Sequence, residues 1–219
     1  MLRTVFLSTA ALTLVVTGAL AAPTNSKLSN GASVTTIAPG HETGGFHHVR
    51  TPKATVIFDS IGSGGYNCCN GWTISGPSSA IGEQIWDAIQ ITPTGKGKVQ
   101  TIAAGVGFVT GSNAAELAIY ADSSGLPGKM LWSGDVSNLP VFGDSSTGTV
   151  GGKVKKVKLK PNTPIWVAVQ TDSNSSDTWD AWNESETTNA ILAGNDGAGW
   201  TSFGSNPAGA VTLYGKMKK

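Results

Sequence analysis

The chain has 219 residues, a formal net charge of +1 and only 13% charged residues. This charge supplies no field that would gather nucleic acid or an acidic membrane, which argues against a nucleic-acid partner. The 29 glycines and seven tryptophans, set among many short apolar runs, are typical of a secreted β-protein.

The first 21 residues are predicted to be a signal peptide. Arg3 supplies a positive charge, residues 5–16 form an apolar run, and Ala19 and Ala21 make the small-x-small pattern that signal peptidase recognises. A transmembrane anchor needs about 20 apolar residues, and this run is shorter. We therefore expect cleavage after Ala21, secretion, and no transmembrane segment in the mature chain.

Residues 22–53 are interpreted as a flexible spacer, because they are rich in Pro, Gly, Ser, Thr and Asn and show no sustained hydrophobic period. The three histidines lie here, in the string HETGGFHH. A zinc-protease helix needs a second His four residues after His41, where Gly45 stands. We interpret the histidines as polar linker residues and place the folded domain at 54–219.

From residue 54 the pattern changes to short β-type runs separated by turn residues. Ile85, Ile89 and Ile91 share one strand face, with Asp87 as a polar interruption, and PIWVAVQ is apolar on both faces like a central strand. The runs predict an all-β fold, a two-sheet antiparallel β-sandwich of jelly-roll type. The expected strands are 55–59, 71–75, 84–92, 99–110, 115–121, 129–136, 149–159, 165–171, 178–182, 190–192 and 210–214.

The lysine-rich run KVKKVKLK is interpreted as an edge strand. Val154 is out of phase with Val157 and Leu159, because Lys155 and Lys156 are adjacent, and such a slip indicates a β-bulge. Lysines on an edge strand prevent pairing with other chains. The alternative, a basic patch for an acidic polymer, is less favoured.

The two cysteines, Cys68 and Cys69, are adjacent and do not cross-link distant parts of the fold. Three states stay open: free thiols, an intermolecular bridge, or a vicinal disulfide. A vicinal disulfide next to Trp72 would add a rigid apolar platform to a ligand site.

Four segments resemble the bacterial extracellular domains called choice-of-anchor R. They are YNCCNGWTISG, ELAIYADSSGLPGKMLWSG, LKPNTPIWVAVQTD followed by DTWDAWN, and GWTSF with AVTLYGK, and together they span roughly residues 55–215. The resemblance implies a secreted, mainly β domain with no established activity, often held at the cell surface by a C-terminal sorting helix. This chain ends in LYGKMKK, so we expect free secretion.

The segment SDTWDAWNE is a candidate carbohydrate site. Sugar faces stack on tryptophan, and neighbouring Asp or Asn side chains bond the hydroxyl groups. The segment offers Trp179, Asp180, Trp182 and Asn183, although residues three apart in a strand point to opposite faces, so one tryptophan is expected in the core. Two further tryptophans are expected in the core outright, Trp86 and Trp166.

A structural calcium is the one cofactor considered. Asp172, Asn174 and Asp177 lie in one loop, and calcium takes six to eight oxygen ligands, commonly from such loops. The EF-hand pattern fails, because Asp177 occupies the place of its glycine. Asx turns explain the same residues without a metal.

No catalytic constellation is evident. The histidines lie in the spacer and no G-x-S-x-G elbow occurs, which argues against a serine hydrolase. Glycoside hydrolysis needs two facing carboxyl groups, for which acids near aromatic residues are candidates. We therefore expect a non-catalytic module for an extracellular polysaccharide or cell-wall component, with a structural surface or matrix protein as the alternative and a glycan-cleaving enzyme as the third hypothesis. The candidate acids are Glu83, Asp87, Asp180, Glu184 and Glu186.

Overall fold

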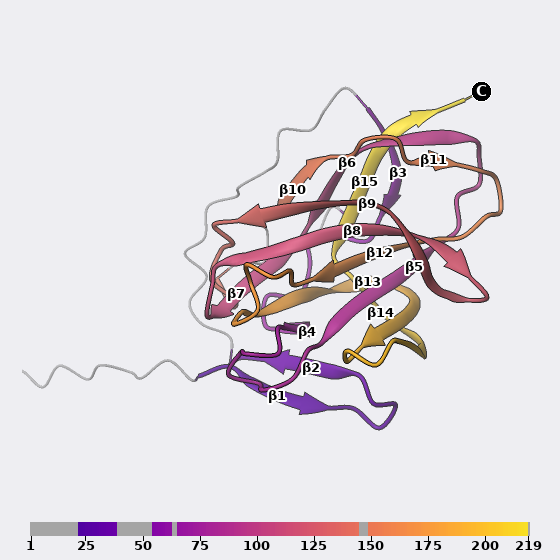
Figure 1. Ribbon diagram of the computed structural model, residues 1–219. Helices are drawn as coiled ribbons and strands as arrows, with labels where there is room; N and C mark the ends of the chain where they lie inside the picture. Colours follow the sequence, from indigo (N-terminus) through magenta and orange to yellow (C-terminus); the bar gives the residue numbers. More distant parts are fainter. Residues whose placement is uncertain (1–21, 39–53, 63–64, 145–148, 219) are drawn as a thin grey trace, which may run out of the picture.

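The computed structural model describes residues 22–38, 54–62, 65–144 and 149–218, so the predicted signal peptide lies outside the described residues. The described part of the chain consists of strands and turns without a helix, and thus contains no helix long and apolar enough to cross a membrane. Two antiparallel sheets pack together as a β-sandwich, which confirms the predicted fold class (Figure 1). The jelly-roll type stays a prediction.

The larger sheet has ten strands. Its order is β1 (Thr24–Lys27), β2 (Ser33–Thr36), β4 (Asn70–Ser75), β13 (Trp179–Asn195), β5 (Trp86–Ile91), β12 (Ile165–Gln170), β8 (Ala114–Ser123) and β9 (Leu126–Ser137). Two further strands pair with β13: β7 (Val106–Thr110) and β14 (Trp200–Gly209).

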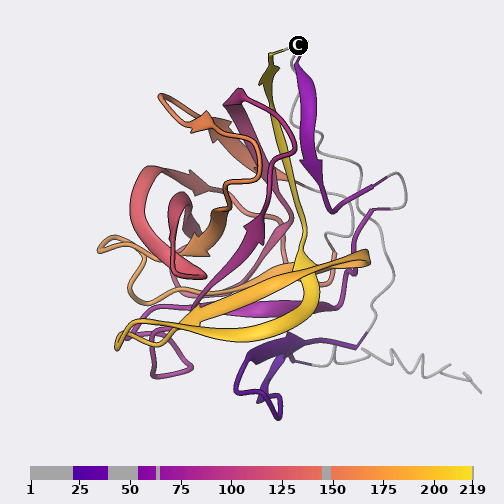
Figure 2. The same ribbon diagram turned by 90° about the vertical axis from the view of Figure 1, so that its right-hand side faces the viewer.

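The smaller sheet has five strands. Its order is β10 (Val150–Lys153), β6 (Gly97–Ala104), β15 (Val211–Met217) and β3 (Thr55–Asp59), and β11 (Lys158–Leu159) also pairs with β6. The chain leaves the larger sheet at Gly209 and enters the smaller one at Val211, so a single residue separates β14 from β15 (Figure 2).

The main core contains side chains from both sheets, among them Ile74, Ile89 and Leu117 from the larger sheet and Ile102 and Leu213 from the smaller one. All five are fully buried. Burial of such side chains stabilises the fold by roughly 1.5–3 kcal/mol each relative to exposure. The core therefore holds the two sheets together, and no disulfide joins distant described segments.

The larger sheet is also covered on its outer face. A row of alanines crosses four strands there, from Ala118 on β8 through Ala168 and Ala88 to Ala193 on β13. Their small side chains leave room for the fully buried ring of Trp166 in the same cluster. Every residue of β12 is consequently buried, which confirms the prediction of a central strand covered from both sides.

The spacer prediction is wrong for residues 22–38. They form the β1–β2 hairpin, and β2 pairs with β4 through Val34, Thr35 and Thr36 (Figure 1). The hairpin turns at Asn30–Gly31, where Gly31 has a φ of 91° and Asn30 Oδ1 accepts a hydrogen bond from the Ala32 amide. Asn-Gly is a strong hairpin signal that the polar composition obscured. Residues 39–53 lie outside the described residues.

Several strand limits differ from those expected. The run 99–110 is split at Gly105, whose N–H and C=O leave the ladder to bond Ala210 and Asn183. The runs 178–182 and 190–192 belong to one strand, β13, and β14 was not expected at all. Its sequence, WTSFGSNPAG, contains two glycines and a proline, which are depleted in strands.

The lysine-rich run lies at a sheet edge, as predicted, since β10 and β11 pair only with β6. Lys156 adopts a φ of 67°, and this kink lets Val154, Val157 and Leu159 all point into the core. The lysines of the run are exposed, which suits protection of an open edge.

Gly209 provides a test of core packing. A Cβ added there would lie 2.2 Å from Cε2 of Trp182, whereas a Cβ on Gly152 meets nothing closer than 4.0 Å. We expect Gly209→Ala to lower the free energy of unfolding by about 1–3 kcal/mol through overpacking. Gly152→Ala should change it by less than about 0.5 kcal/mol. Urea denaturation measures both, and equal stabilities would contradict this account of the core.

Candidate functional site

An open groove of about 340 Å³ lies along the larger sheet where β5 begins and β12 ends. Trp86 lines it from the first position of β5, and Glu116 and Gln170 line it from β8 and β12. Trp86 is only partly buried, in contrast to its expected place in the core. Its indole Nε1–H donates a hydrogen bond to Thr171 Oγ1 at 3.0 Å, which fixes the ring at the groove.

Two loops complete the groove. Residues 77 and 84 come from the loop before β5, and residues 171–173 and 176 come from the loop after β12. The loops are tied together because the Gly76 amide donates to Thr178 O and the Ser78 amide to Ser176 O, each at 2.9 Å. A Cβ on Gly76 would lie 2.1 Å from Ser176 O, so glycine is required for this approach.

Asp172 organises the second loop. Its Oδ1 accepts hydrogen bonds from the Asn174 amide at 2.9 Å and from the Ser175 amide at 3.0 Å, and also from the Ser175 hydroxyl at 2.7 Å. Chiefly the Ser175 hydroxyl lowers the pKa of the Asp172 carboxyl. The groove therefore has a pre-formed wall that carries a negative charge.

Amide and carboxylate groups line the floor of the groove. Gln170 is buried, its Oε1 accepts from the Tyr120 hydroxyl at 2.6 Å, and its Nε2 donates to Glu116 Oε2. Burial is the main cause that raises the pKa of Tyr120 to about 12, so the phenol stays protonated and donates. This network fixes the Gln170 amide through both its Oε1 and its Nε2 atoms. Gln170 donates to Oε2 of Glu116, so Glu116 Oε1 receives no hydrogen bond from Gln170.

The arrangement suits a neutral ligand rich in hydroxyl groups. An amphipathic indole offers an apolar surface, and Gln84, Glu116 and Gln170 add donors and acceptors close by. The side chains are already held in position by the protein, so little ordering is needed when a ligand binds.

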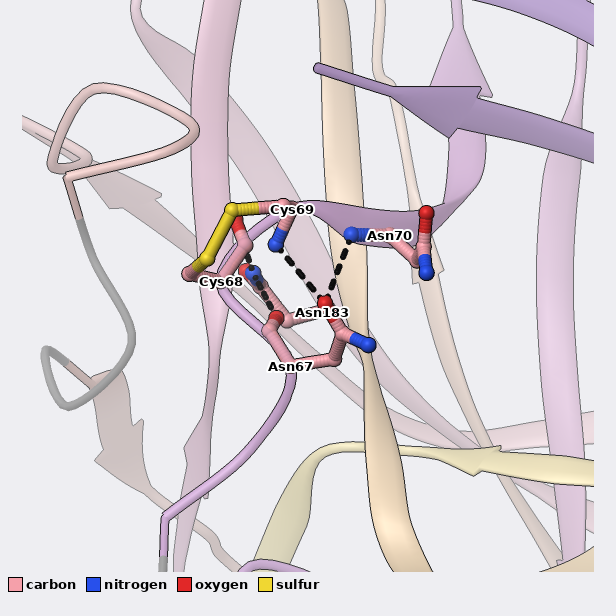
Figure 3. The surroundings of a disulfide bond; sticks show 5 residues. All are labelled: Asn67, Cys68, Cys69, Asn70 and Asn183. Carbon is pink, nitrogen blue, oxygen red and sulfur yellow. Dashed lines mark hydrogen bonds between the residues drawn. A yellow bond between two sulfur atoms is a disulfide. The ribbon is translucent and has the colours of Figure 1, made fainter. Parts of the chain in front are cut away.

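The two cysteines form a vicinal disulfide, one of the three states left open by the sequence (Figure 3). Asn67 Oδ1 accepts from the Cys69 amide at 2.9 Å and from the Asn70 amide at 3.0 Å. Asn183 Nδ2 donates to Asn67 O at 2.7 Å and to Cys68 O at 3.3 Å. Cys69 is buried and Cys68 partly so. Asn183 thus holds the cysteine turn in place.

The tryptophans expected at a sugar site lie elsewhere. Trp72 and Trp182 are 1% and 0% exposed, and their indole N–H groups donate to Pro207 O and Ala210 O at 3.0 Å. Neither offers a face for stacking. Trp179 is partly buried and bonds Thr35 Oγ1 of the hairpin at 3.0 Å. The prediction that Trp179 and Trp182 take opposite faces agrees with this placement.

Asp180 is in the core. It pairs with Ile74 of β4 and Phe108 of β7, is 0% exposed, and neither carboxyl oxygen has a hydrogen-bond partner. Burial raises its pKa well above the usual value and so favours the neutral form. Asp180 and the buried Asn183 therefore do not contact a sugar, and their assignment as ligand-binding residues is wrong.

The proposed calcium ligands do not converge. Asn174 turns its Nδ2 toward Asp172 Oδ2, at 2.9 Å, so it presents a donor where a cation needs an oxygen. The Asp177 carboxyl is bonded by Ser112, which lowers its pKa. No cluster of three or more His, Cys, Asp or Glu suited to a metal occurs among the described residues. The loop is an Asx turn.

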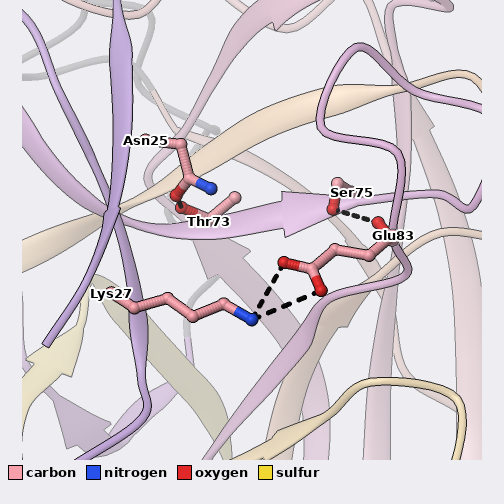
Figure 4. A network of polar contacts seen from close by, with 5 residues as sticks. All are labelled: Asn25, Lys27, Thr73, Ser75 and Glu83. Carbon is pink, nitrogen blue, oxygen red and sulfur yellow. Dashed lines mark hydrogen bonds and ion pairs between the residues drawn. The ribbon is translucent and has the colours of Figure 1, made fainter. Parts of the chain in front are cut away.

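Of the acids considered for glycoside hydrolysis, Glu83 and Asp87 line one pocket, and the other three do not. Glu83 pairs with Lys27 of the β1–β2 hairpin at 3.1 Å (Figure 4), while Asp180 is enclosed in the core. Glu186 is exposed. Burial raises the pKa of Glu184. Asp87 lies on the core face of β5, as the pattern of isoleucines predicted.

Sequence reasoning missed the groove. In QIWDAIQIT the isoleucines mark the core face, so strict alternation places Trp86, Ala88 and Gln90 on the opposite face. That signal was present but was outweighed by the general tendency of tryptophan to be buried. The approach of Glu116 and Gln170 depends on the pairing of β8 with β12, which a single sequence does not reveal.

Comparison with known proteins assigns no family: no protein-family model matches the chain, and no curated protein matches it significantly. The resemblance to choice-of-anchor R domains therefore stays a prediction, and function must be argued from the groove.

Asp180→Asn tests the buried neutral acid. Folding raises the Asp180 pKa. Above the unfolded-state pKa of about 4, the unfolded chain therefore ionises more readily than the folded protein, and the native protein loses stability as the pH rises. We expect Asp180→Asn to gain stability relative to the native protein above pH 4, by at most about 1.4 kcal/mol per pH unit. Urea denaturation between pH 4 and 7 measures this. The exposed Asp135→Asn is the control, and parallel pH curves for all three proteins would contradict the account.

Proposed function

We propose that this protein is a secreted, non-catalytic carbohydrate-binding domain that binds an extracellular polysaccharide through the Trp86 groove. The observation that carries the proposal is a fixed indole beside amide and carboxylate side chains in one open groove. Such a combination matches the alternation of apolar faces and hydroxyl groups on a sugar ring.

Two features support the extracellular location. The N-terminal segment has the pattern of a signal peptide, and the adjacent cysteines are joined in a disulfide. Disulfides persist in oxidising compartments and are rare in the cytosol.

The groove favours binding over cleavage. A glycoside hydrolase needs one carboxyl group that holds a proton for the leaving oxygen and a second that acts as nucleophile or base. Both carboxyl groups of this groove, Glu116 and Asp172, accept hydrogen bonds from neighbouring side chains. The hydrogen bonds to Asp172 lower its pKa, so this carboxyl is not prepared to hold the proton of a general acid.

Trp86→Ala tests the proposal against a panel of insoluble polysaccharides and cell-wall preparations. We expect at least about tenfold weaker retention, since stacking and apolar contact on an indole contribute more than about 1.4 kcal/mol. Trp179→Ala is the matched control, because Trp179 is also partly buried and its indole also donates to a threonine hydroxyl at 3.0 Å.

The Trp179→Ala variant should bind as the native protein does, and both variants should show a cooperative thermal transition. If only Trp179→Ala lost retention, the binding site would lie at Trp179 on β13 and not in the Trp86 groove. No retention of the native protein on any polysaccharide would reject the proposal and favour a structural surface or matrix role.

A further inference from the structure

A second pocket, of about 180 Å³, lies on the opposite side of β5 from the groove. It is formed where the β1–β2 hairpin meets the start of β5 and the β13–β14 hairpin. Nothing in the proposed sugar site uses it, because Trp86 faces the outer side of β5 while the next residue, Asp87, lines this pocket.

Asp87 is the unusual feature of the pocket. Its side chain is 1% exposed, and neither carboxyl oxygen has a hydrogen-bond partner in the structure. Burial raises the pKa of this carboxyl well above its ordinary value. A buried polar group without partners is costly, and native proteins nearly always satisfy it, so an unpartnered carboxyl that lines a pocket points to a ligand.

Gly194 allows the Phe203 ring to lie beside this carboxyl. It pairs with Asp87 across β13 and β5, and a Cβ added to it would lie 3.2 Å from Asp87 Oδ1 and 2.4 Å from Cε2 of Phe203. The Phe203 ring thus occupies the space that a side chain at position 194 would fill, close to the Asp87 carboxyl. A carboxylate attracts cations by charge, and the ring attracts them through its negative face.

The rim of the pocket is acidic. Lys27 from β1, Glu83 from the loop before β5 and Asp196 from the β13–β14 turn are the charged residues that line it besides Asp87. Lys27 Nζ is held by Glu83, at 3.1 Å from Oε1 and 3.3 Å from Oε2 (Figure 4). With Lys27 engaged there, Asp196 is the second rim carboxylate, and the charge at the rim favours an approaching cation.

We infer that this pocket binds a small ligand through a primary ammonium group, which donates hydrogen bonds to Asp87 beside the Phe203 ring. An ammonium has three donors and suits the two free oxygens of one carboxylate. A divalent metal requires several oxygen or nitrogen ligands, and no suitable cluster occurs in the described part of the chain. A neutral hydroxyl group would also bond the carboxyl, but the negative charge of the rim would not attract it.

The charge state of Asp87 couples binding to pH. Burial raises the Asp87 pKa and favours the protonated carboxyl in the free protein, whereas an ammonium favours the ionised form, so binding is coupled to release of a proton from Asp87. Affinity should rise with pH until Asp87 is ionised in the free protein. The other charged groups that line the pocket are Lys27 and Glu83, which pair with each other, and Asp196.

The test uses n-propylammonium and its neutral counterpart 1-propanol, titrated into the native protein and followed by amide NMR shifts of Asp87 and Gly194. We expect saturable shifts with propylammonium and at least about tenfold weaker binding of 1-propanol, since a hydrogen bond to a charged group contributes more than about 1.4 kcal/mol. Propylammonium binding should strengthen between pH 5 and 7. This comparison needs no variant.

Asp87→Asn then removes the charge with little change of shape and should weaken propylammonium binding at least about tenfold. Asp135→Asn, a change at an exposed acid of β9 that does not line the pocket, is the control and should leave propylammonium binding unchanged. Equal binding of the two probes to the native protein, binding that is independent of pH, or no saturable shift would each overturn the inference. Trp86→Ala should leave propylammonium binding unchanged, so the two sites fail or succeed separately.

Discussion

The backbone pairing of β13 is the constraint on which the rest of the structure depends. This strand runs from Trp179 to Asn195, and its first part is hydrogen-bonded to β4 and β7 while its second part is bonded to β5 and β14. One continuous strand therefore holds four others in register. Any slip by one residue would exchange the two faces of the sheet and expose Trp182.

The consequences of this register reach each feature described above. The side chain of Asn183, in the first part of β13, holds the cysteine turn. At the other end of β13, Asn195 pairs with Trp86 of the groove. Gly194 lies one residue away, on the opposite face, and lets the Phe203 ring pack beside Asp87. The alternation of a single strand thus places the Trp86 groove and the acidic pocket on opposite sides of the same sheet.

The two buried carboxyl groups show how the fold and possible function are connected. Asp180 is 0% exposed, lines neither the groove nor the second pocket, and its carboxyl oxygens have no hydrogen-bond partner, so its burial is a cost to stability. Asp87 is equally buried but lines a pocket, and a ligand there would satisfy it. The difference is one of surroundings rather than of residue type, and it appears only when the sheets are assembled.

The sequence was informative where local periodicity controls structure. The double-sided burial of β12, the interruption at Asp87 and the edge position of the lysines all follow from alternation and charge. It failed for β1 and β2, where threonine and serine strands resemble a polar spacer, and for β14, where Gly and Pro are tolerated at the edge of a long hairpin. Composition misled there because pairing with a neighbour, rather than propensity, stabilises these strands.

The same limit applies to the candidate site. The segment SDTWDAWNE was expected to carry the sugar site with one of its two tryptophans, but Trp182 packs against Gly209 in the core, and the groove is assembled from three strands distant in sequence. Adjacent residues on a strand face opposite ways, whereas residues on neighbouring strands share a face. Which strands are neighbours depends on long-range pairing that no local pattern reports.

The most direct measurement is the indole N–H NMR spectrum, in which the seven tryptophans give separate probes. It would be recorded while an oligosaccharide fragment of a retained polysaccharide is titrated into the protein. The account predicts that the signal of Trp86 shifts with saturation while those of the buried Trp72, Trp166 and Trp182 stay in place. A spectrum in which Trp179 shifts and Trp86 does not, or in which no indole responds, would contradict it.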